Sequence, residues 1–343
     1  MTKLSDIILN DAKSSMEGID FSRLKNKSVL ITGASGLVGT YLLTGLAHIP
    51  QKSRPKQIYA ICQSKPERHW KEITGRVRAT VIRGDFCNDR FVGGLPKADV
   101  IIHASGYAQP GKFMMDPLKT IKLNTAVTLK LLGKLESKGK FLFISTSEVY
   151  SGLAHPPFKE NQIGTTNTDH PRSCYIEGKR CGEAMIHAAR SMGVDAKSVR
   201  LALAYGPGTR KDDKRVLNSF IGRAFIERKI EMMDSGETLR TYVYVTDATQ
   251  MMWRILLHGK EGLYNVGGIS RTTIAKLARL IGKIIKVPVI IPKSKKQALT
   301  AAPEDVRLDL SKVRKEFGKK DFVSLEKGVR KTIEWQKELY DIT

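Results

Sequence analysis

The chain has 343 residues, 41% of them hydrophobic, which suffices for one large domain or for a domain with a substantial second lobe. No apolar stretch is long enough to cross a membrane, and the polar segment from Met1 to Arg23 lacks the apolar core of a signal peptide. A cytoplasmic protein is therefore expected. Four scattered cysteines without a CxxC pair argue against a disulfide framework and against a bound metal.

The net charge of +24 comes from 58 basic and 34 acidic residues. A basic surface attracts nucleic acid, but these charges are spread along the chain, and no helix-turn-helix, zinc-finger or RNP motif accompanies them. The alternative is a solvated basic surface around a site for an anionic small molecule. We therefore expect neither nucleic acid nor a membrane as a partner.

Short apolar runs alternate with amphipathic segments through the first part of the chain. Strands are predicted at 29–32, 58–62, 80–82, 100–103, 141–145 and 196–203, and helices at 37–46, 117–138 and 175–192. This alternation predicts an α/β fold, with a Rossmann-type doubly wound parallel sheet that is covered on both faces.

The pattern changes after Pro207, where short strands and helices mix and helices are expected at 273–285 and 325–340. This part is predicted to form a smaller lobe over the carboxyl ends of the sheet, where such folds bind their ligands. We therefore divide the chain into an N-terminal helical extension (1–26), a Rossmann domain that carries the catalytic residues (27–206), and a mainly substrate-binding lobe (207–343). Some segments of the lobe are expected to return to the Rossmann domain.

The sequence GASGLVG, residues 33–39, lies between the first predicted strand and the first predicted helix. Glycines there permit a tight turn and let backbone N–H groups approach a pyrophosphate, to which the helix N-terminus adds partial positive charge. The turn predicts a dinucleotide site that includes Gly33, Ser35, Gly36, Leu37, Val38 and Gly39.

The end of the second strand should carry an acid that holds the adenosine ribose, but Gln63 follows it instead. Gln63 can hydrogen-bond a ribose hydroxyl, whereas Lys65 and Arg68 suit a 2′-phosphate. We expect NAD as the cofactor, with NADP as the alternative. Further cofactor contacts are expected after the third and fourth strands, from Asp85, Phe86, Ala104, Ser105 and Gly106.

Tyr175 and Lys179 form a YxxxK motif at the start of a predicted helix, where the spacing puts both side chains on one face. A tyrosine with its ordinary pKa of about 10 is a poor base at neutral pH. A lysine ammonium and an oxidised nicotinamide both favour the phenolate, which can take a proton from a substrate hydroxyl while hydride passes to the cofactor.

A hydroxyl-rich segment, STSEVY at 145–150, follows the fifth predicted strand. One of its hydroxyls can share a hydrogen bond with the substrate oxygen. Glu148 is unusual at the end of a buried strand, and it is either a solvated loop carboxylate or an acid/base group beside the substrate. We favour the second interpretation, because carboxylates in clefts commonly perform acid/base chemistry.

The segments ITGASGLVG, DPLKTIKLNT, STSEVY, PRSCYIEGKR and SGETLRTYVYVTD together resemble the extended short-chain dehydrogenase/reductases that act on nucleotide sugars. The resemblance runs from about Lys27 to the C-terminus. It is greatest to UDP-glucuronate decarboxylases, and smaller to dTDP-glucose 4,6-dehydratases and C4 epimerases. By this resemblance, a homodimer is expected, built from the helix after the fourth strand and the YxxxK helix.

The resemblance also implies roles for individual residues. The catalytic set is Thr146, Glu148, Tyr175 and Lys179, and Asn124 joins the cofactor site. The expected substrate-binding residues are Tyr107, Gln109, Ser147, Glu148, Arg215 and Arg240, of which the two arginines would approach the diphosphate or a sugar acid.

The chain departs from its relatives at Leu203, where they carry an asparagine that helps to hold the sugar nucleotide. All three reactions begin with oxidation at C4, but a dehydratase typically uses an Asp-Glu pair where this chain has Ser147 and Glu148. We therefore expect decarboxylation of the UDP-glucuronate to UDP-xylose type. The alternatives are 4,6-dehydration, C4 epimerisation and, in a different class, a non-catalytic NAD(P)-binding regulator.

Overall fold

The computed structural model describes residues 1–292 and 305–342 and is built around a parallel sheet of seven strands. The strand order is β10-β6-β5-β4-β1-β2-β3. The chain adds β2 and β3 on one side of β1 and then crosses to add β4, β5 and β6 on the other side, so the order of the strands reverses between β1 and β4. Ligands of such sheets bind at this reversal, outside the carboxyl ends of the strands. The predicted Rossmann-type architecture is confirmed. The strands are β1 (Ser28–Thr32), β2 (Gln57–Cys62), β3 (Thr80–Arg83), β4 (Ala98–His103), β5 (Leu135–Thr146), β6 (Asp195–Leu201) and β10 (Leu263–Val266).

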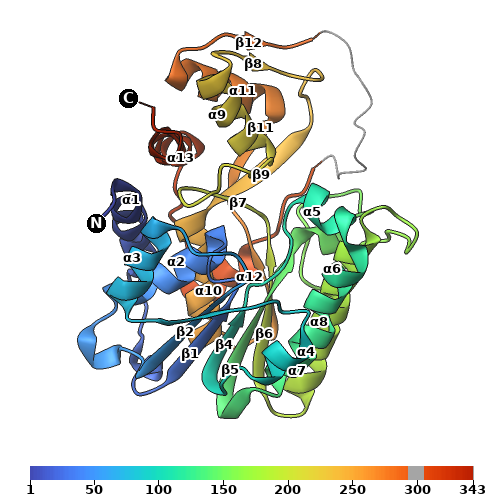
Figure 1. The fold of residues 1–343 in the computed structure, drawn as a ribbon. Coiled ribbons are helices and arrows are strands. Elements are labelled where there is room, and N and C mark those ends of the chain that lie inside the picture. The colour runs from blue at the N-terminus through green and yellow to red at the C-terminus, as the bar shows by residue number, and fades with distance from the viewer. Residues whose placement is uncertain (293–304, 343) are drawn as a thin grey trace.

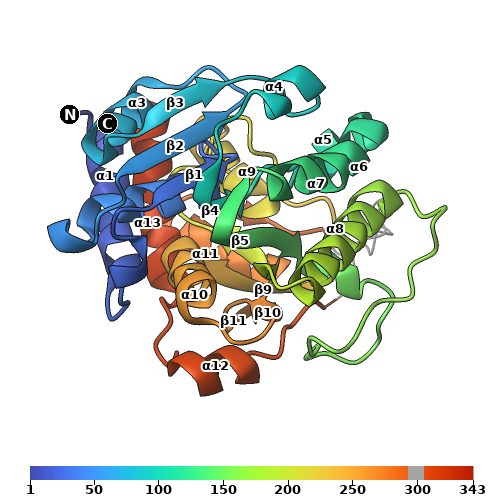
Figure 2. The same cartoon turned by 90° about the horizontal axis from the view of Figure 1, so that it is seen from below.

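Alternating side chains of the sheet form two separate hydrophobic cores. Val29 and Ile31 of β1 face one core, and Leu30 faces the other, because successive residues of a strand point to opposite sides. The first core is covered by α2 (Leu37–Gly45) and α10 (Val245–His258), and the second by α6 (Pro117–Asn124), α7 (Ala126–Leu132) and α8 (Ser173–Ser191). Figure 2 shows these two helical layers on either side of the sheet.

The remaining helices extend these layers or join the strands. They are α1 (Lys3–Ala12), α3 (Arg68–Val77), α4 (Asp89–Gly93), α5 (Pro110–Met115), α12 (Ser311–Phe317) and α13 (Leu325–Leu339), with short 3-10 turns that include η1 (Lys13–Met16), η2 (Ser22–Leu24), η3 (Leu46–His48), η4 (Gln51–Ser53) and η5 (Ser147–Tyr150). No helix in the described parts of the chain is long and apolar enough to cross a membrane.

A smaller lobe lies over the sheet (Figure 1). It contains two small sheets, with strand orders β11-β9-β7 and β12-β8, and a hydrophobic core of its own. Between these lobe segments the chain returns to the main sheet as β10, next to β6. The lobe elements are β7 (Leu203–Tyr205), α9 (Val216–Ile226), β8 (Ile230–Glu231), β9 (Leu239–Tyr244), β11 (Ser270–Thr273), α11 (Ile274–Ile285) and β12 (Val289–Ile290).

Two predicted elements were wrong in extent. The helix predicted at 117–138 breaks at Thr125 and ends at Leu132, and the chain then enters β5, because residues from Leu135 onward pair with β4. Pairing with a neighbouring strand here overrides local helix propensity. The strand predicted at 196–203 ends at Leu201, because its neighbours β5 and β10 end at the residues that pair with Leu201. Leu203 pairs with β9 of the lobe instead.

Candidate active site

The glycine turn presses directly against the end of β4. Gly33 has a φ of +64°, and a Cβ at this position would lie 2.6 Å from the carbonyl oxygen of Ala104. Both the left-handed conformation and the close approach require glycine. The turn therefore brings the start of α2 next to the residues that follow β4, as a dinucleotide-binding turn requires.

One cleft of about 380 Å³ opens at the carboxyl ends of β1, β4 and β5, a size in the ordinary range of ligand pockets. It brings together all four expected catalytic residues and most of the expected binding residues. The expected residues that line it are Gly33, Ser35, Gly36, Leu37, Val38, Gly39, Gln63, Phe86, Ala104, Ser105, Gly106, Tyr107, Gln109, Thr146, Glu148, Tyr175, Lys179 and Arg215.

Four expected residues lie outside the lining of the cleft. Asp85 is instead paired with Lys119, whose Nζ lies 3.0 Å from its carboxylate. Asn124 is fully buried behind Gly106 and donates to the carbonyl oxygen of Thr120. The other two are Ser147, which is buried in η5, and Arg240, a mostly buried residue of β9.

Tyr175 and Lys179 are both buried at the base of the cleft. Lys179 Nζ donates to the carbonyl oxygen of Ile144 at 2.6 Å, and burial lowers the lysine pKa to about 7. The Tyr175 ring stacks on Phe113, with centroids 4.6 Å apart and an angle of 5° between the rings. These contacts fix the orientation of both side chains.

The pKa of Tyr175 is raised above its ordinary value, first by burial and then by the nearby charge of Glu148. A hydrogen bond with Thr146 and the positive charges of Arg172 and Arg215 oppose this rise. The geometry therefore places Thr146 within hydrogen-bonding reach of the Tyr175 hydroxyl, but burial and Glu148 together favour the protonated phenol at neutral pH. Additional positive charge beside the ring is needed to generate the phenolate.

Glu148 is clamped by Arg172, an arginine to which the sequence analysis assigned no role. Arg172 is only 6% exposed and donates to both carboxylate oxygens of Glu148. Its Nε donates to Oε2 at 2.9 Å, and its Nη2 donates to Oε1. The backbone N–H of Glu148 also donates to Thr146 Oγ1 at 3.2 Å. Glu148 is thus an oriented carboxylate rather than a freely solvated one.

The one feature of the sequence that pointed to Arg172 is its closeness to the YxxxK motif: it lies three residues before Tyr175, at the start of α8. Its guanidinium lies over the Phe113 ring, 5.3 Å from the centroid, on which Tyr175 also stacks. Phe113 therefore links the Glu148–Arg172 pair to Tyr175, the expected catalytic base.

Arg215 enters the cleft from the segment between β7 and α9. Asp213, another residue that the sequence analysis missed, accepts from Arg215 Nε at 3.0 Å and from a terminal nitrogen at 2.6 Å. The other terminal nitrogen of Arg215 points to the carbonyl oxygen of Ala204 at 3.3 Å. Asp213 therefore orients the guanidinium, and Leu203 adds an apolar patch to the same wall.

Two buried hydroxyls of the cleft support its fit to a dinucleotide. Ser105 Oγ and Thr209 Oγ1 have no hydrogen-bond partner within the described chain, although both residues line the cleft. Buried polar atoms normally find a partner, so a polar ligand that supplies one fits these positions. The glycine turn, which leaves room for a pyrophosphate, lies in the same cleft.

Comparisons with known proteins agree with this geometry. Residues 29–267 match the NAD dependent epimerase/dehydratase family. The chain is 30% identical to UDP-glucuronic acid decarboxylase 1 of Xenopus tropicalis, over 93% of this chain and 74% of the relative. It is 31% identical to UDP-glucuronic acid decarboxylase 6 of Arabidopsis thaliana, over 89% of this chain and 87% of the relative.

A solved structure of an epimerase from Methanothermobacter thermautotrophicus has a similar fold, with a TM-score of 0.79. The sequences are 18% identical, and the superposition covers 94% of this chain and 95% of that one. At this identity, the similarity describes the arrangement of the elements.

Proposed function

This chain belongs to the NAD dependent epimerase/dehydratase family, and from that premise we propose that it decarboxylates a nucleotide-linked sugar acid of the UDP-glucuronate type. Two relatives that match most of its length carry the name UDP-glucuronic acid decarboxylase. The product of the proposed reaction is the corresponding UDP-pentose, of the UDP-xylose type.

One observation favours decarboxylation over dehydration: of the two described acids that line the cleft, Asp213 is paired with Arg215, and Glu148 is the one whose charge acts on Tyr175. Glu148 lines the cleft, whereas Ser147 is buried outside it. A 4,6-dehydratase must protonate a departing C6 hydroxyl, and the residue in the matching position here is a serine that neither ionises nor faces the cleft. A β-keto acid loses CO₂ without a leaving-group acid, so Glu148 alone suffices.

The residues of the chain divide the proton transfers between them. The Tyr175 phenolate accepts the proton of the C4 hydroxyl, and Thr146 holds a hydrogen bond to the same phenolic oxygen. A bound oxidised nicotinamide supplies the hydride acceptor and the positive charge that lowers the Tyr175 pKa. After CO₂ leaves, Glu148 is the acid/base group placed to assist protonation at C5. Tyr175 would then return its proton to the C4 oxygen while hydride is delivered to the C4 carbon.

The anionic parts of the substrate have matching arginines. Arg215, oriented by Asp213, suits an oxygen of the diphosphate, because a fixed guanidinium donates to phosphate from more than one nitrogen. Arg240 lies close enough to Glu148 and Arg172 to interact with their charges, which supports a role near the sugar carboxylate. Leu203 replaces an amide in the same wall and makes the sugar-nucleotide contact more apolar.

A homodimer is part of this proposal. Leu118 and Ile121 of α6 and Leu129 of α7 expose apolar side chains on one flank, beside α8. The exposed residues of α8 include Cys181, Ala184 and Ala188, and Met192 continues their helical spacing at the C-cap of the helix. Two such helix pairs from two copies would form a four-helix bundle that covers this surface.

The test is incubation of the purified protein with UDP-glucuronate and either oxidised dinucleotide. We expect release of CO₂ and formation of a UDP-pentose or UDP-4-keto-pentose, detected by mass spectrometry. Tyr175→Phe should lower turnover at least about a hundredfold, since general base catalysis contributes about 10²–10⁴. Tyr59→Phe is the matched control, because Tyr59 lies on β2 and does not line the cleft.

Absence of both CO₂ and a pentose product contradicts the proposal. Conversion of a nucleotide hexose into a 4-keto-6-deoxy sugar would indicate a dehydratase, and a change of C4 configuration without CO₂ would indicate an epimerase. Full activity in Tyr175→Phe would refute the assignment of the catalytic base.

A further inference from the structure

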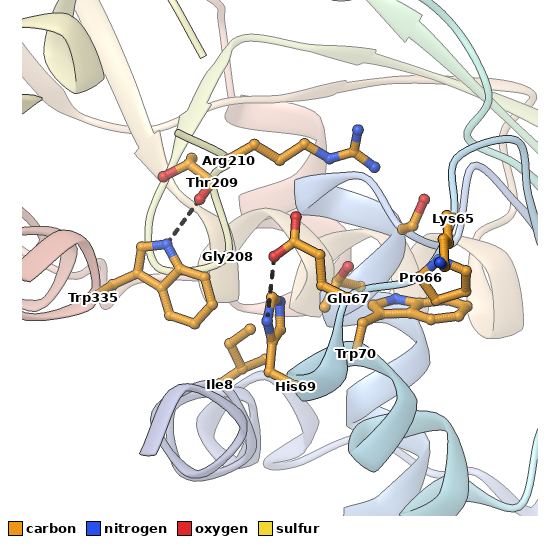
Figure 3. Close-up of a pocket in the computed structure, with 12 residues that line it drawn as sticks. Ile8, Lys65, Pro66, Glu67, His69, Trp70, Gly208, Thr209, Arg210 and Trp335 are labelled. Carbon is orange, nitrogen blue, oxygen red and sulfur yellow. Dashed lines mark hydrogen bonds and ion pairs between the residues drawn. The ribbon is translucent and has the colours of Figure 1, made fainter. Parts of the chain in front are cut away.

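The end of β2 contains no acid at the position next to the adenosine ribose. Gln63 and Ser64 follow the strand and line the cleft, and Lys65 comes next on the rim of a smaller adjoining pocket. Arg210 reaches the same place from the loop after β7 and lines both cavities. Figure 3 shows Arg210 extended across this pocket, with Lys65 on the facing segment.

Neither of these two cations has an acidic partner in the parts of the chain that the structure describes. The one hydrogen bond of the Arg210 guanidinium goes to the neutral hydroxyl of Ser64, at 3.2 Å. The nearby carboxylate of Asp212 is paired with Lys112 at 2.8 Å, although it still interacts with Arg210 through its charge. An arginine and a lysine without acid partners at one end of a cleft form a site for an anion.

The structure also corrects the candidate that the sequence suggested. In the NADP alternative, Arg68 would share this role with Lys65, but its side chain is 85% exposed and pairs with Glu72 one helical turn along α3. Arg210 takes its place, although it lies 146 residues from Ser64 in sequence.

Two buried tryptophans, Trp70 and Trp335, hydrogen-bond to backbone segments beside this pocket. Trp70 Nε1 donates to the carbonyl oxygen of Ala34 in the glycine turn at 3.0 Å. Trp335 Nε1 donates to the carbonyl oxygen of Thr209 at 2.8 Å, and its ring meets that of His69 edge-on at 5.2 Å. The backbone beside Arg210 is therefore fixed relative to the turn that would receive the pyrophosphate, as a preformed binding site requires.

We propose that Ser64, Lys65 and Arg210 bind the 2′-phosphate of NADP(H), so that this chain uses the phosphorylated dinucleotide in preference to NAD(H). An arginine near the end of the second strand is how this fold accommodates a 2′-phosphate, whereas an acid there binds the free 2′-hydroxyl. This proposal rests on the dinucleotide cleft of the proposed function and is independent of the sugar chemistry.

Glu67 is the one described acid that lines the smaller pocket, and its carboxylate faces His69 Nδ1 at 3.5 Å (Figure 3). It lies four residues beyond Gln63, on the side of the pocket near Trp335. A carboxylate here weakens the binding of a phosphate but does not remove it, because two cations lie in the same place. Glu67→Gln should therefore tighten NADP⁺ binding and leave NAD⁺ binding unchanged.

The experiment is calorimetric titration of the nucleotide-free full-length protein with NADP⁺, NAD⁺, adenosine 2′,5′-bisphosphate and AMP. The last two differ only in the 2′-phosphate, and we expect the bisphosphate to bind at least about tenfold more tightly. Arg210→Ala and Lys65→Ala should each remove much of this preference and leave AMP binding unchanged. Arg68→Ala is the matched control, with the same change of charge on a side chain outside the pocket.

Equal or tighter binding of NAD⁺ overturns the 2′-phosphate site and leaves the proposed decarboxylase intact. A preference for NADP⁺ that survives both Arg210→Ala and Lys65→Ala overturns the assignment to these residues. If neither dinucleotide binds, both this proposal and the proposed function fail. CO₂ release in the activity assay reports on the sugar chemistry separately.

Discussion

Lys179 is a buried charge of the proposed active site. It is 5% exposed, and its Nζ contacts the carbonyl oxygen of Ile144 and lies 4.8 Å from the centroid of the Phe143 ring. No described acidic side chain forms an ion pair with it, and Glu183 raises its pKa only through a longer-range interaction. Burial disfavours the ammonium and lowers its pKa to about 7, from an ordinary value of 10.5. The buried ammonium thus lowers the stability of the folded chain, at a residue whose proposed role is catalytic.

This cost should depend on pH. The pKa of Lys179 is lower in the folded chain than in the unfolded chain, so the unfolded state binds the extra proton between about pH 7 and 10.5. The destabilisation is therefore full below pH 7 and disappears as the pH rises through this window. We expect Lys179→Met to be more stable than the wild type at pH 6, by an amount that shrinks at pH 10. Urea unfolding at both pH values measures the difference.

The exposed Lys56→Met provides the control, because its effect on unfolding should be small and equal at the two pH values. If the difference in free energy of unfolding between Lys179→Met and the wild type is the same at pH 6 and pH 10, burial does not lower the pKa of Lys179 as proposed.

Helix α1 is the element that joins the N-terminal extension to the body of the enzyme. It packs on α2, α3 and α13, and its Asp11 is buried. The Asp11 carboxylate accepts from the phenolic hydroxyls of Tyr41 at 2.8 Å and Tyr244 at 2.7 Å, and it also pairs with Lys331. One carboxylate thereby connects α1 to α2, to the lobe strand β9 and to α13.

Removal of this carboxylate should be strongly destabilising. Asp11→Ala leaves two buried phenolic hydroxyls without their acceptor, at a cost of about 1–3 kcal/mol each, and removes the partner of the partly exposed Lys331. We expect a loss of that order in the free energy of unfolding, measured by urea denaturation. Asp6→Ala, on the same helix but in its first turn, should cost less than about 1 kcal/mol. Equal effects of the two substitutions would contradict the connecting role of Asp11.

The elements and residues that could be predicted from the sequence are those with local signals. The glycine turn, the YxxxK helix and most strands follow from spacing and hydrophobic pattern within short windows. The Arg172 clamp on Glu148 spans 24 residues and the Arg210 contact with Ser64 spans 146, and such pairings leave no local pattern. Likewise, β5 begins where it does because its residues pair with β4. The hydrophobic pattern of those residues alone does not show this pairing.

At the scale of the whole molecule, the flank formed by α6, α7 and α8 has an unusual surface. Leu118 is 78% exposed and Leu129 is 60% exposed, in a chain whose net charge is +24. Figures 1 and 2 both place these helices together, away from the first helical layer of the sheet. Contiguous exposed apolar side chains on a strongly charged protein are typical of an interface.

The proposed homodimer can be tested by placing a charge on this flank. We expect the wild type to have twice the 38.2 kDa mass of the chain by light scattering after size-exclusion chromatography, and Leu118→Asp to have the mass of the monomer. Two copies of one substitution meet or lie close across a symmetric interface, so the added charges would be buried together. Met233→Asp, an exposed methionine of the lobe, should remain dimeric. A monomeric wild type, or a dimeric Leu118→Asp variant, would contradict assembly through this helical flank.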